Sequence, residues 1–386
     1  MTTNSLRAFG VGLVALDLLV SADPVRPIQA RAGGTCGNVL SILSYLGWDA
    51  YPIARLDDGP TSQRIEKDLV RWGVNTDFLR CAPACGAPIV VQRNEVRNGA
   101  TRHRFVWHCP RCGRRLPGFR PITLDAASQV GGAVAGSSVF FMDRLSRAAL
   151  ALAARASRAG ALVVFEPSGR SDPKLFADAL GVAHVVKYAD DRLGDAGGTM
   201  DDGAATLLEI QTLGARGLRF RHRLAGAPGG WRELPAIDAG NVVDTCGAGD
   251  WCTAGLLDRA ARDGRKGFEA AGVDALVEAL VYGQTLAARN CRSEGARGAM
   301  YEADGKPISD WFRATDADDP EPGFCPVCQS SASAEDWRRS EPALCRGQEN
   351  RRKDGRRNRN TARQTTREAG SLRTVSVRCS GYRRTE

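Results

Sequence analysis

The chain has 386 residues, 43% of them hydrophobic, which suffices for one large domain with additions. Its formal net charge is +9, but residues 331–386 hold 15 Lys and Arg against 7 Asp and Glu, so nearly all of the excess marks a tail. The near-neutral remainder argues against a nucleic-acid-binding surface on the folded part. The apolar run Val11–Val20 contains Asp17 and is too short to span a bilayer, and no signal peptide is visible. We therefore expect a cytoplasmic protein without a membrane segment.

The first predicted element is Phe9–Val20, a nearly continuous apolar run typical of a strand buried on both faces. Asp17 interrupts this run near its end. A buried charge is costly unless it is paired or binds ligand hydroxyls at a sheet edge. Asp17 is therefore a candidate substrate-binding residue, with a turn-capping role as the alternative.

A glycine loop leading into a helix is predicted at Arg31–Trp48, where apolar residues recur at helical spacing. Gly33 and Gly34 have no side chain, so the backbone there can approach a sugar closely. Asn38 offers both a donor and an acceptor to a pair of hydroxyls. The alternative for Asn38 is that it caps the helix.

A small sheet is predicted within residues 76–120. A strand at Ala50–Ala54 and a helix at Gly59–Trp72 precede it. Its strands are expected at Thr76–Leu79, Ala87–Gln92 and Thr101–Trp107, with a hairpin signal at residues 97–99.

The 12 cysteines indicate metal binding or buried thiols rather than disulfides in a reducing compartment. Cys109 and Cys112 form a C-P-x-C-G knuckle, and Cys325 and Cys328 form a second C-P-x-C pair. Two such pairs brought together by folding would supply the four thiolates of a structural zinc site. The alternative is two unrelated cysteine pairs. The reserve ligands are Cys81, Cys85, His103, His108 and Cys345.

Strands and helices alternate at short spacing after the small sheet, which predicts βαβ units and a mostly parallel sheet. Ligands of such sheets bind beyond the carboxyl ends of the strands, where we expect Asp17, Glu166 and Lys187. The predicted strands are Ser137–Met142, Ala161–Phe165 and His184–Lys187, and the predicted helices are Arg144–Arg158 and Pro173–Leu180.

A glycine turn at the start of a helix is the most informative stretch. Val242–Asp250 reads as an extended segment that ends in a tight turn, and Gly247 and Gly249 let backbone N–H groups point into one concavity. These groups and the helix dipole favour a phosphate. A carboxylate beside them, Asp250, suits removal of a proton from an acceptor hydroxyl during phosphoryl transfer. The alternative is that Asp250 only caps the helix.

Three motifs resemble those of the ribokinase-like (PfkB) carbohydrate kinases. Residues 244–250 carry all six fixed letters of the D-T-x-G-A-G-D signature, and Gly33, Gly34 and Asn38 match its N-terminal Gly-Gly and Asn. Thr212, Gly214 and Gly217 match a T-x-G-x-x-G turn that, taken alone, is common in hairpins. The resemblance extends from about Phe9 to about Met300.

The resemblance implies an α/β fold, a ribokinase-like three-layer sandwich with a mostly parallel central sheet and a small β lid. It implies ATP and magnesium as cofactors. It assigns Asp250 as general base, with Gly247, Ala248 and Gly249 as the anion hole. Asp17, Gly33, Gly34 and Asn38 would bind the substrate. The nucleotide would lie along Thr212, Gly214, Gly217, Lys187, Thr245 and Asn290.

Two departures from the family pattern concern metal and substrate. An N-x-x-E element that arranges magnesium and phosphate is replaced by Ala189 and Arg192, although Asp190 or Asp191 could serve through water. Related ribose-specific kinases often carry a Lys at one of the positions of Thr35 and Cys36, so a preference for ribose is not supported.

We expect a kinase domain at residues 1–313, a linker at 314–330 and a disordered basic tail at 331–386. The predicted function is ATP-dependent phosphorylation of a hydroxyl of a sugar or nucleoside. The alternatives are a catalytically impaired, kinase-like sugar-binding protein and a zinc-containing nucleic-acid-binding adaptor. Nucleic acid is otherwise expected only as a weak, salt-sensitive partner of the tail. A homodimer formed through the lid is a further candidate.

Overall fold

The computed structural model describes residues 6–80, 85–97, 100–169, 172–193, 200, 204–224, 229–304, 306, 308, 324–325 and 330–331. The chain divides into two units, residues 1–340 and 341–386, and the second lies outside the described residues. The predicted tail is described only at residue 331, and the predicted linker only at 324–325 and 330. These two predictions therefore stay predictions.

The central sheet has eight strands among the described residues, in the order β12-β11-β10-β9-β8-β7-β1-β4. Its strands are β1 (Arg7–Val11), β4 (Asp49–Ile53), β7 (Val139–Met142), β8 (Leu162–Phe165), β9 (Val185–Ala189), β10 (Leu208–Thr212), β11 (Leu218–His222) and β12 (Arg232–Leu234). Neighbours from β10 to β4 run parallel, and β11 and β12 add an antiparallel edge. The inner strands are short, wholly apolar runs because both faces of the sheet are covered.

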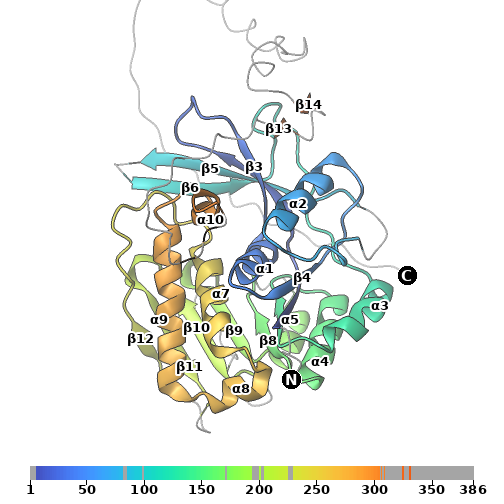
Figure 1. Cartoon of the computed structure of the whole chain (residues 1–386), viewed down its shortest axis with the longest axis vertical. Helices are drawn as coiled ribbons and strands as arrows, with labels where there is room; N and C mark the ends of the chain where they lie inside the picture. The colour runs from blue at the N-terminus through green and yellow to red at the C-terminus, as the bar shows by residue number, and fades with distance from the viewer. Residues whose placement is uncertain are drawn as a thin grey trace, which may run out of the picture. The chain divides into compact units, whose positions relative to one another are not determined.

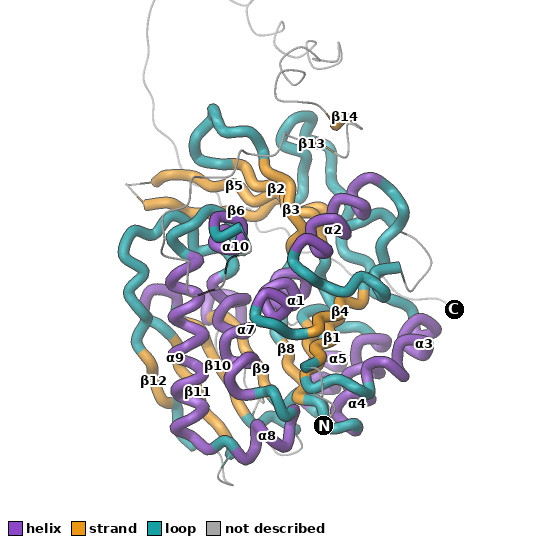
Figure 2. The backbone as a smooth tube through the Cα atoms, viewed as in Figure 1, coloured by secondary structure: helices purple, strands orange, loops and turns teal. Residues whose placement is uncertain are grey.

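Two separate cores lie on the two faces of this sheet. Alternate side chains point to opposite faces, so Phe141 and Val164 join one core while Phe140 and Phe165 join the other. The helices of the first core are α1 (Thr35–Tyr45), α2 (Pro60–Arg71), α7 (Ala248–Ala260), α8 (Gly264–Ala270), α9 (Gly272–Asn290) and α10 (Gly298–Glu302). Those of the second are α3 (Leu124–Val134), α4 (Arg147–Arg158) and α5 (Pro173–Leu180). The predicted three-layer sandwich is confirmed (Figure 2).

A second, four-stranded sheet has the order β3-β2-β5-β6. Its strands are β2 (Ala15–Val20), β3 (Gln29–Gly33), β5 (Ile89–Arg97) and β6 (Ala100–Val106). Figure 1 shows β5 and β6 at one end of the helical layers, near the short helix α10 (Gly298–Glu302). This sheet is the predicted lid, although β2 and β3 come from the N-terminal segment rather than from residues 76–120.

The predicted single strand Phe9–Val20 is wrong, because the chain leaves the central sheet after β1 and enters the lid sheet as β2. The change occurs at Gly12, where an added Cβ would lie 1.6 Å from Oδ1 of Asp143. The N–H of Leu13 donates to the same oxygen at 2.9 Å, which fixes the turn. Asp17 therefore lies in the lid sheet and not at the end of a central strand. The strand expected at Thr76–Leu79 is also wrong, since these residues form turns.

Helices α7 and α9 cross at a contact that only glycine allows. A Cβ added to Gly255 would lie 2.6 Å from the Cα of Gly283, and one added to Gly283 would lie 2.4 Å from the carbonyl oxygen of Cys252. Both distances are below those of real Cβ contacts, so a methyl group would push α7 away from α9. Because Asp250 lies in the first turn of α7, this contact also sets the position of that carboxylate.

We expect Gly283→Ala to lower the free energy of unfolding by about 1–3 kcal/mol, the usual cost of overpacking. The matched control is Gly132→Ala in α3, where an added Cβ meets nothing within 4 Å. That control should stabilise the helix by up to about 1 kcal/mol, because Ala is a better helix former than Gly. Urea unfolding of both variants checks the pair, and equal effects would contradict the close-contact explanation.

Candidate active site

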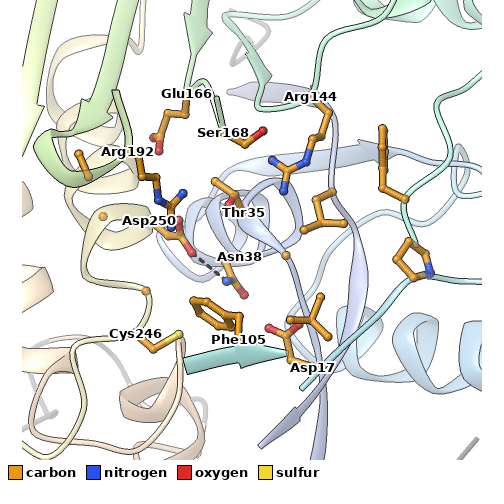
Figure 3. Close-up of a pocket in the computed structure, with 18 of the residues that line it drawn as sticks. Asp17, Thr35, Asn38, Phe105, Arg144, Glu166, Ser168, Arg192, Cys246 and Asp250 are labelled. Carbon is orange, nitrogen blue, oxygen red and sulfur yellow. Dashed lines mark hydrogen bonds between the residues drawn. The ribbon is translucent and has the colours of Figure 1, made fainter. Parts of the chain in front are cut away.

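A cavity of about 660 Å³ opens between the lid and the carboxyl ends of the central strands. The N-terminal ends of α1 and α7 contribute to its floor (Figure 3). It is lined by nine of the residues predicted from the sequence: Asp17, Gly34, Asn38, Lys187, Thr212, Thr245, Gly247, Gly249 and Asp250. His103, Phe105 and Trp107 of the lid segment form part of its wall. The structure thus brings residues from both ends of the kinase-like segment into one cleft.

Asp250 and Asn38 are in direct contact although 212 positions separate them in the chain. Nδ2 of Asn38 donates to Oδ2 of Asp250 at 2.8 Å (Figure 3). Asn38 is buried in α1, and Asp250 is half-buried in the first turn of α7. The packing of α1 against α7 therefore joins the glycine loop to the carboxylate.

Arg297, which the sequence analysis did not single out, fixes the orientation of Asn38. Its Nε donates to Oδ1 of Asn38 at 3.2 Å, and its side chain is 2% exposed. A guanidinium can only donate and an ionised carboxylate can only accept, so the amide must turn its oxygen to Arg297 and its nitrogen to Asp250. Asp68 holds Arg297 through a 3.0 Å ion pair.

Burial and, to a lesser extent, the charge of Glu166 raise the pKa of Asp250, which lies at about 7. The hydrogen bond from Asn38 and the charges of Lys187 and Arg192 act in the opposite direction. Burial likewise raises the pKa of Asp17 to about 7, against the backbone N–H of Gly34 and the charge of Arg297. A carboxylate with a pKa near 7 is well matched to proton transfer at neutral pH.

The turn before α7 forms an anion-accepting nest. Gly247 has φ 75°, and an added Cβ there would lie 2.2 Å from the carbonyl oxygen of Ala296, so only glycine fits. Within the described part of the chain, the backbone N–H groups of Gly247, Gly249 and Asp250 have no acceptor. Three open donors at the start of a 13-residue helix suit a phosphate.

Lys187 brings a fixed positive charge to the nest. Its Nζ lies 3.5 Å from the position that a Cβ on Gly249 would occupy. It is 4% exposed and pairs with Glu166 at 2.9 Å, and Thr253 donates to the other oxygen of Glu166. The ion pair with Glu166 fixes the ammonium group of Lys187 beside the nest.

Asp244, the first residue of the D-T-x-G-A-G-D stretch, ties the lid to the nest. Its side chain is 1% exposed and accepts from Gln92 at 2.6 Å and Asn94 at 3.2 Å, both on β5 of the lid. His103 on β6 lies 3.2 Å away, and the backbone N–H of Cys246 donates at 2.9 Å. Burial raises the pKa of Asp244, but His103 and the backbone N–H groups of Cys246 and Gly295 lower it below its usual value. The contacts with β5 and β6 make Asp244 a positioning residue between the lid and the nest.

The comparisons with known proteins show the family and the fold. The family model of the pfkB family carbohydrate kinases matches residues 13–303. The chain belongs to that family. No curated protein matches the chain in sequence.

Solved structures of sugar and nucleoside kinases share the fold at low sequence identity. An ATP-bound fructokinase from Xylella fastidiosa superposes with a TM-score of 0.59 at 19% identity, covering 75% of this chain and 93% of that one. A ribokinase from Giardia lamblia gives 0.56 at 14% identity, covering 76% and 96%. An aminoimidazole riboside kinase from Salmonella enterica gives 0.53 at 21% identity, covering 75% and 95%. The fold is that of sugar and nucleoside kinases.

Five residues predicted for the site do not line the cavity. Gly33 makes room beneath it, because an added Cβ would lie 1.9 Å from Oδ2 of Asp17. Asn290 is fully buried and bonds the backbone of Cys246, Gly295 and Ala299, so it supports the nest from behind. The remaining three are Ala248, Gly214 and Gly217.

The residues present fit a magnesium ion carried by ATP better than one held by the protein. Where the family often has N-x-x-E, Ala189 and Arg192 line the cavity and offer no carboxylate. Both oxygens of Glu166 are engaged by Lys187 and Thr253. Across the part of the chain that the structure describes, no group of three or more His, Cys, Asp or Glu residues could hold a metal ion.

The predicted zinc site is only half described. Cys109 is buried and Cys112 exposed, in a turn closed by hydrogen bonds from Cys109 N to Arg114 O (2.8 Å) and from Gly113 N to Cys109 O (2.9 Å). Cys328 and the side chain of Cys325 lie outside the described residues. Zinc binding therefore stays a prediction.

None of the helices that the structure describes is long and apolar enough to cross a membrane.

Metal analysis by mass spectrometry of protein purified without chelator should find about one zinc per chain if the four cysteines form a site. Cys112→Ser should remove most of this zinc, because a three-ligand site binds it more weakly. The control is Cys291→Ser at the C-terminal end of α9, because Cys291 is neither one of the four predicted ligands nor a reserve ligand. A zinc-free wild-type protein would rule out the shared site.

Proposed function

We propose that this pfkB-family protein transfers the γ-phosphoryl group of ATP to a hydroxyl of a sugar or nucleoside. The observation that carries the proposal is the contact between Asn38 and Asp250 at the mouth of the nest, inside one cavity. It supports a general base that faces an acceptor hydroxyl on one side and a phosphate on the other.

The acceptor would be held by Asp17, the backbone of Gly34 and the amide of Asn38. In the transfer step the acceptor oxygen forms a bond to the γ-phosphorus while the bond from that phosphorus to the β,γ-bridging oxygen breaks. The hydroxyl proton passes to Asp250, and ADP leaves. The N–H groups of the nest and Lys187 would stabilise the charge on the transferred group. Magnesium, when bound with ATP, would neutralise the other phosphate oxygens.

The nucleotide would lie on the side of the nest formed by Thr245, Lys187 and Thr212, which line the cavity together. Gly214 and Gly217 shape the turn after β10 rather than the cavity wall. Gly217 is required there because an added Cβ would lie 2.2 Å from the carbonyl oxygen of Leu234.

A sugar-binding protein without transferase activity is the second candidate, favoured by the absence of N-x-x-E. ATP consumption across a panel of sugars and nucleosides distinguishes the two candidates. Turnover with any acceptor supports the kinase, whereas acceptor binding without turnover supports the alternative.

Asp250→Asn should lower kcat by about 10²–10⁴, the usual contribution of a general base, and leave ATP binding unchanged. The substitution should not lower the stability of the fold. The raised pKa of Asp250 means that the folded chain binds this proton more tightly than the unfolded chain, so the ionised carboxylate destabilises the fold as pH rises through about 7. Above that pH, thermal unfolding of the Asn variant should occur at a slightly higher temperature than that of the wild type.

The control is Asp274→Asn, which removes an exposed carboxylate from the first turn of another helix, α9. It should leave kcat unchanged and give no stability gain. Retention of full phosphorylation by Asp250→Asn would show that another group accepts the proton.

The pH profile should show kcat/KM rising with pH through an apparent pKa near 7, because only the ionised form of Asp250 accepts a proton. Arg192→Ala removes a charge that lowers this pKa, so the rising limb should move to higher pH. Arg265→Ala, which breaks an exposed pair with Glu269 outside the cavity, is the control and should leave the limb in place. An unmoved limb in Arg192→Ala would contradict the assignment of that limb to Asp250.

A further inference from the structure

Arg144 is a cavity residue for which neither the motifs nor the proposed transfer step has a use. It lies between the end of β7 and the start of α4 and lines the cavity. In the view of Figure 3, Arg144 and Asp250 lie on opposite sides of Thr35, the first residue of α1. Both residues line the same cavity as Thr35.

A buried carboxylate holds Arg144 by one nitrogen only. Nη1 donates to Oδ2 of Asp143 at 2.7 Å and to the carbonyl oxygen of Asp143 at 3.0 Å. The side chain of Asp143 is 1% exposed, and its other oxygen accepts from the backbone N–H of Leu13 at 2.9 Å. The guanidinium is therefore anchored from the protein side.

The rest of the guanidinium is open to the cavity. Nε and Nη2 of Arg144 have no acceptor within the described residues, and the side chain is 26% exposed. Neutralising Asp143 needs only Nη1, so the remaining N–H groups are available for a bidentate contact. Preorganised N–H groups of this kind recognise carboxylate and phosphate oxygens.

The strand order places Arg144 on the acceptor side. Thr212 and Lys187 belong to β10 and β9, whereas Arg144 follows β7, the neighbour of β1. The segment after β1 leads through Leu13, which binds Asp143, to Asp17 on β2. Arg144 is thus two strands away from Lys187, on the side of the substrate-binding Asp17. A group bound to Arg144 belongs to the acceptor and not to ATP.

We propose that the acceptor is an anionic polyhydroxyl compound whose carboxylate or phosphate group binds Arg144. This inference rests on the proposed function and names its substrate class. The hydroxyl to be phosphorylated faces Asp250, other hydroxyls donate to Asp17, and the anionic group lies at the far end, where Thr35 and Ser168 add hydroxyl groups to the wall (Figure 3). Without its contact to Arg144, an anion would face the charges of Asp17 and Asp250 unpaired.

The test compares matched acceptors with the full-length chain, ATP and magnesium. Glucose, gluconate and glucose 6-phosphate form one set, and fructose and fructose 6-phosphate form another. We expect at least one anionic acceptor to exceed its neutral counterpart in kcat/KM. The acid and the phosphate ester are separate arms that show which oxyanion is used.

Arg144→Ala should lower kcat/KM for the preferred anionic acceptor by roughly 30- to 1000-fold, as when one partner of a desolvated charge pair is removed. It should change kcat/KM for neutral acceptors by less than about threefold, because a neutral acceptor offers Arg144 no charge to pair with. Arg144→Lys, which keeps the charge but loses the planar fork, should recover part of the loss. Arg147→Ala, three positions further on and paired on the surface with Asp178, is the control that should behave as wild type.

Two outcomes would overturn the inference while leaving the kinase intact. One is preferred phosphorylation of neutral acceptors by the wild-type protein. The other is an equal loss for both acceptor classes in Arg144→Ala. If no acceptor is phosphorylated, the proposed function fails, and calorimetry of gluconate and glucose 6-phosphate binding then decides the inference alone. Binding lost in Arg144→Ala supports it, and no binding to wild type overturns it.

Discussion

The geometry of the cavity depends on the side-chain amide of Asn38. This amide is held between a group that can only donate hydrogen bonds and a group that, once ionised, can only accept them. Arg297 binds the oxygen of Asn38, and Asp250 binds its nitrogen. Rotating the amide by 180° would put N–H against guanidinium and oxygen against carboxylate, so two charges select one orientation. Through this amide the glycine loop, the start of α7 and the loop after α9 are fixed relative to one another.

Such a site works against the stability of the fold around it. Asp17 and Asp250 lie in surroundings that raise the pKa of each, which means that their ionised forms are poorly solvated there. The free energy that stabilises the fold comes from apolar packing elsewhere, above all from the two cores on the two faces of the eight-stranded sheet. The close crossing of α7 and α9 at Gly255 and Gly283 keeps α7, and with it Asp250, in place.

The sequence predicted what depends on local pattern. Apolar runs such as those of β7 and β8 identified strands, their alternation with helices identified the parallel sheet, and the spacing of Gly247, Gly249 and Asp250 identified the nest. The prediction was wrong where a residue far away in the chain determines the local structure. The break at Gly12 depends on Asp143, 131 positions away, and nothing in the run Phe9–Val20 shows it.

The same limit explains why Arg297 and Asp244 received no role from the sequence. Arg297 acts through Asn38 and Asp68, and Asp244 through Gln92 and Asn94 on the lid, so each role exists only when separate elements meet. A basic residue before a glycine and an acidic residue before a threonine carry no local signal of burial. Their roles as positioning residues follow from their hydrogen-bond partners and their burial, which only the folded structure shows.

Positively charged side chains lie at two separate ends of the cavity. At the nest, Lys187 is neutralised by Glu166 yet lies beside open N–H groups, and Arg192 adds an exposed charge where the family often carries a carboxylate. At the other end, Arg144 is anchored by Asp143 and faces inward. A ligand with negative charge at both ends is therefore matched by positive charge at both ends of the cavity, and Asp17 and Asp250, which also line it, can accept hydrogen bonds from its hydroxyl groups. In the proposed reaction the phosphates of ATP supply the negative charge at the nest, and an anionic group of the acceptor supplies the negative charge at Arg144.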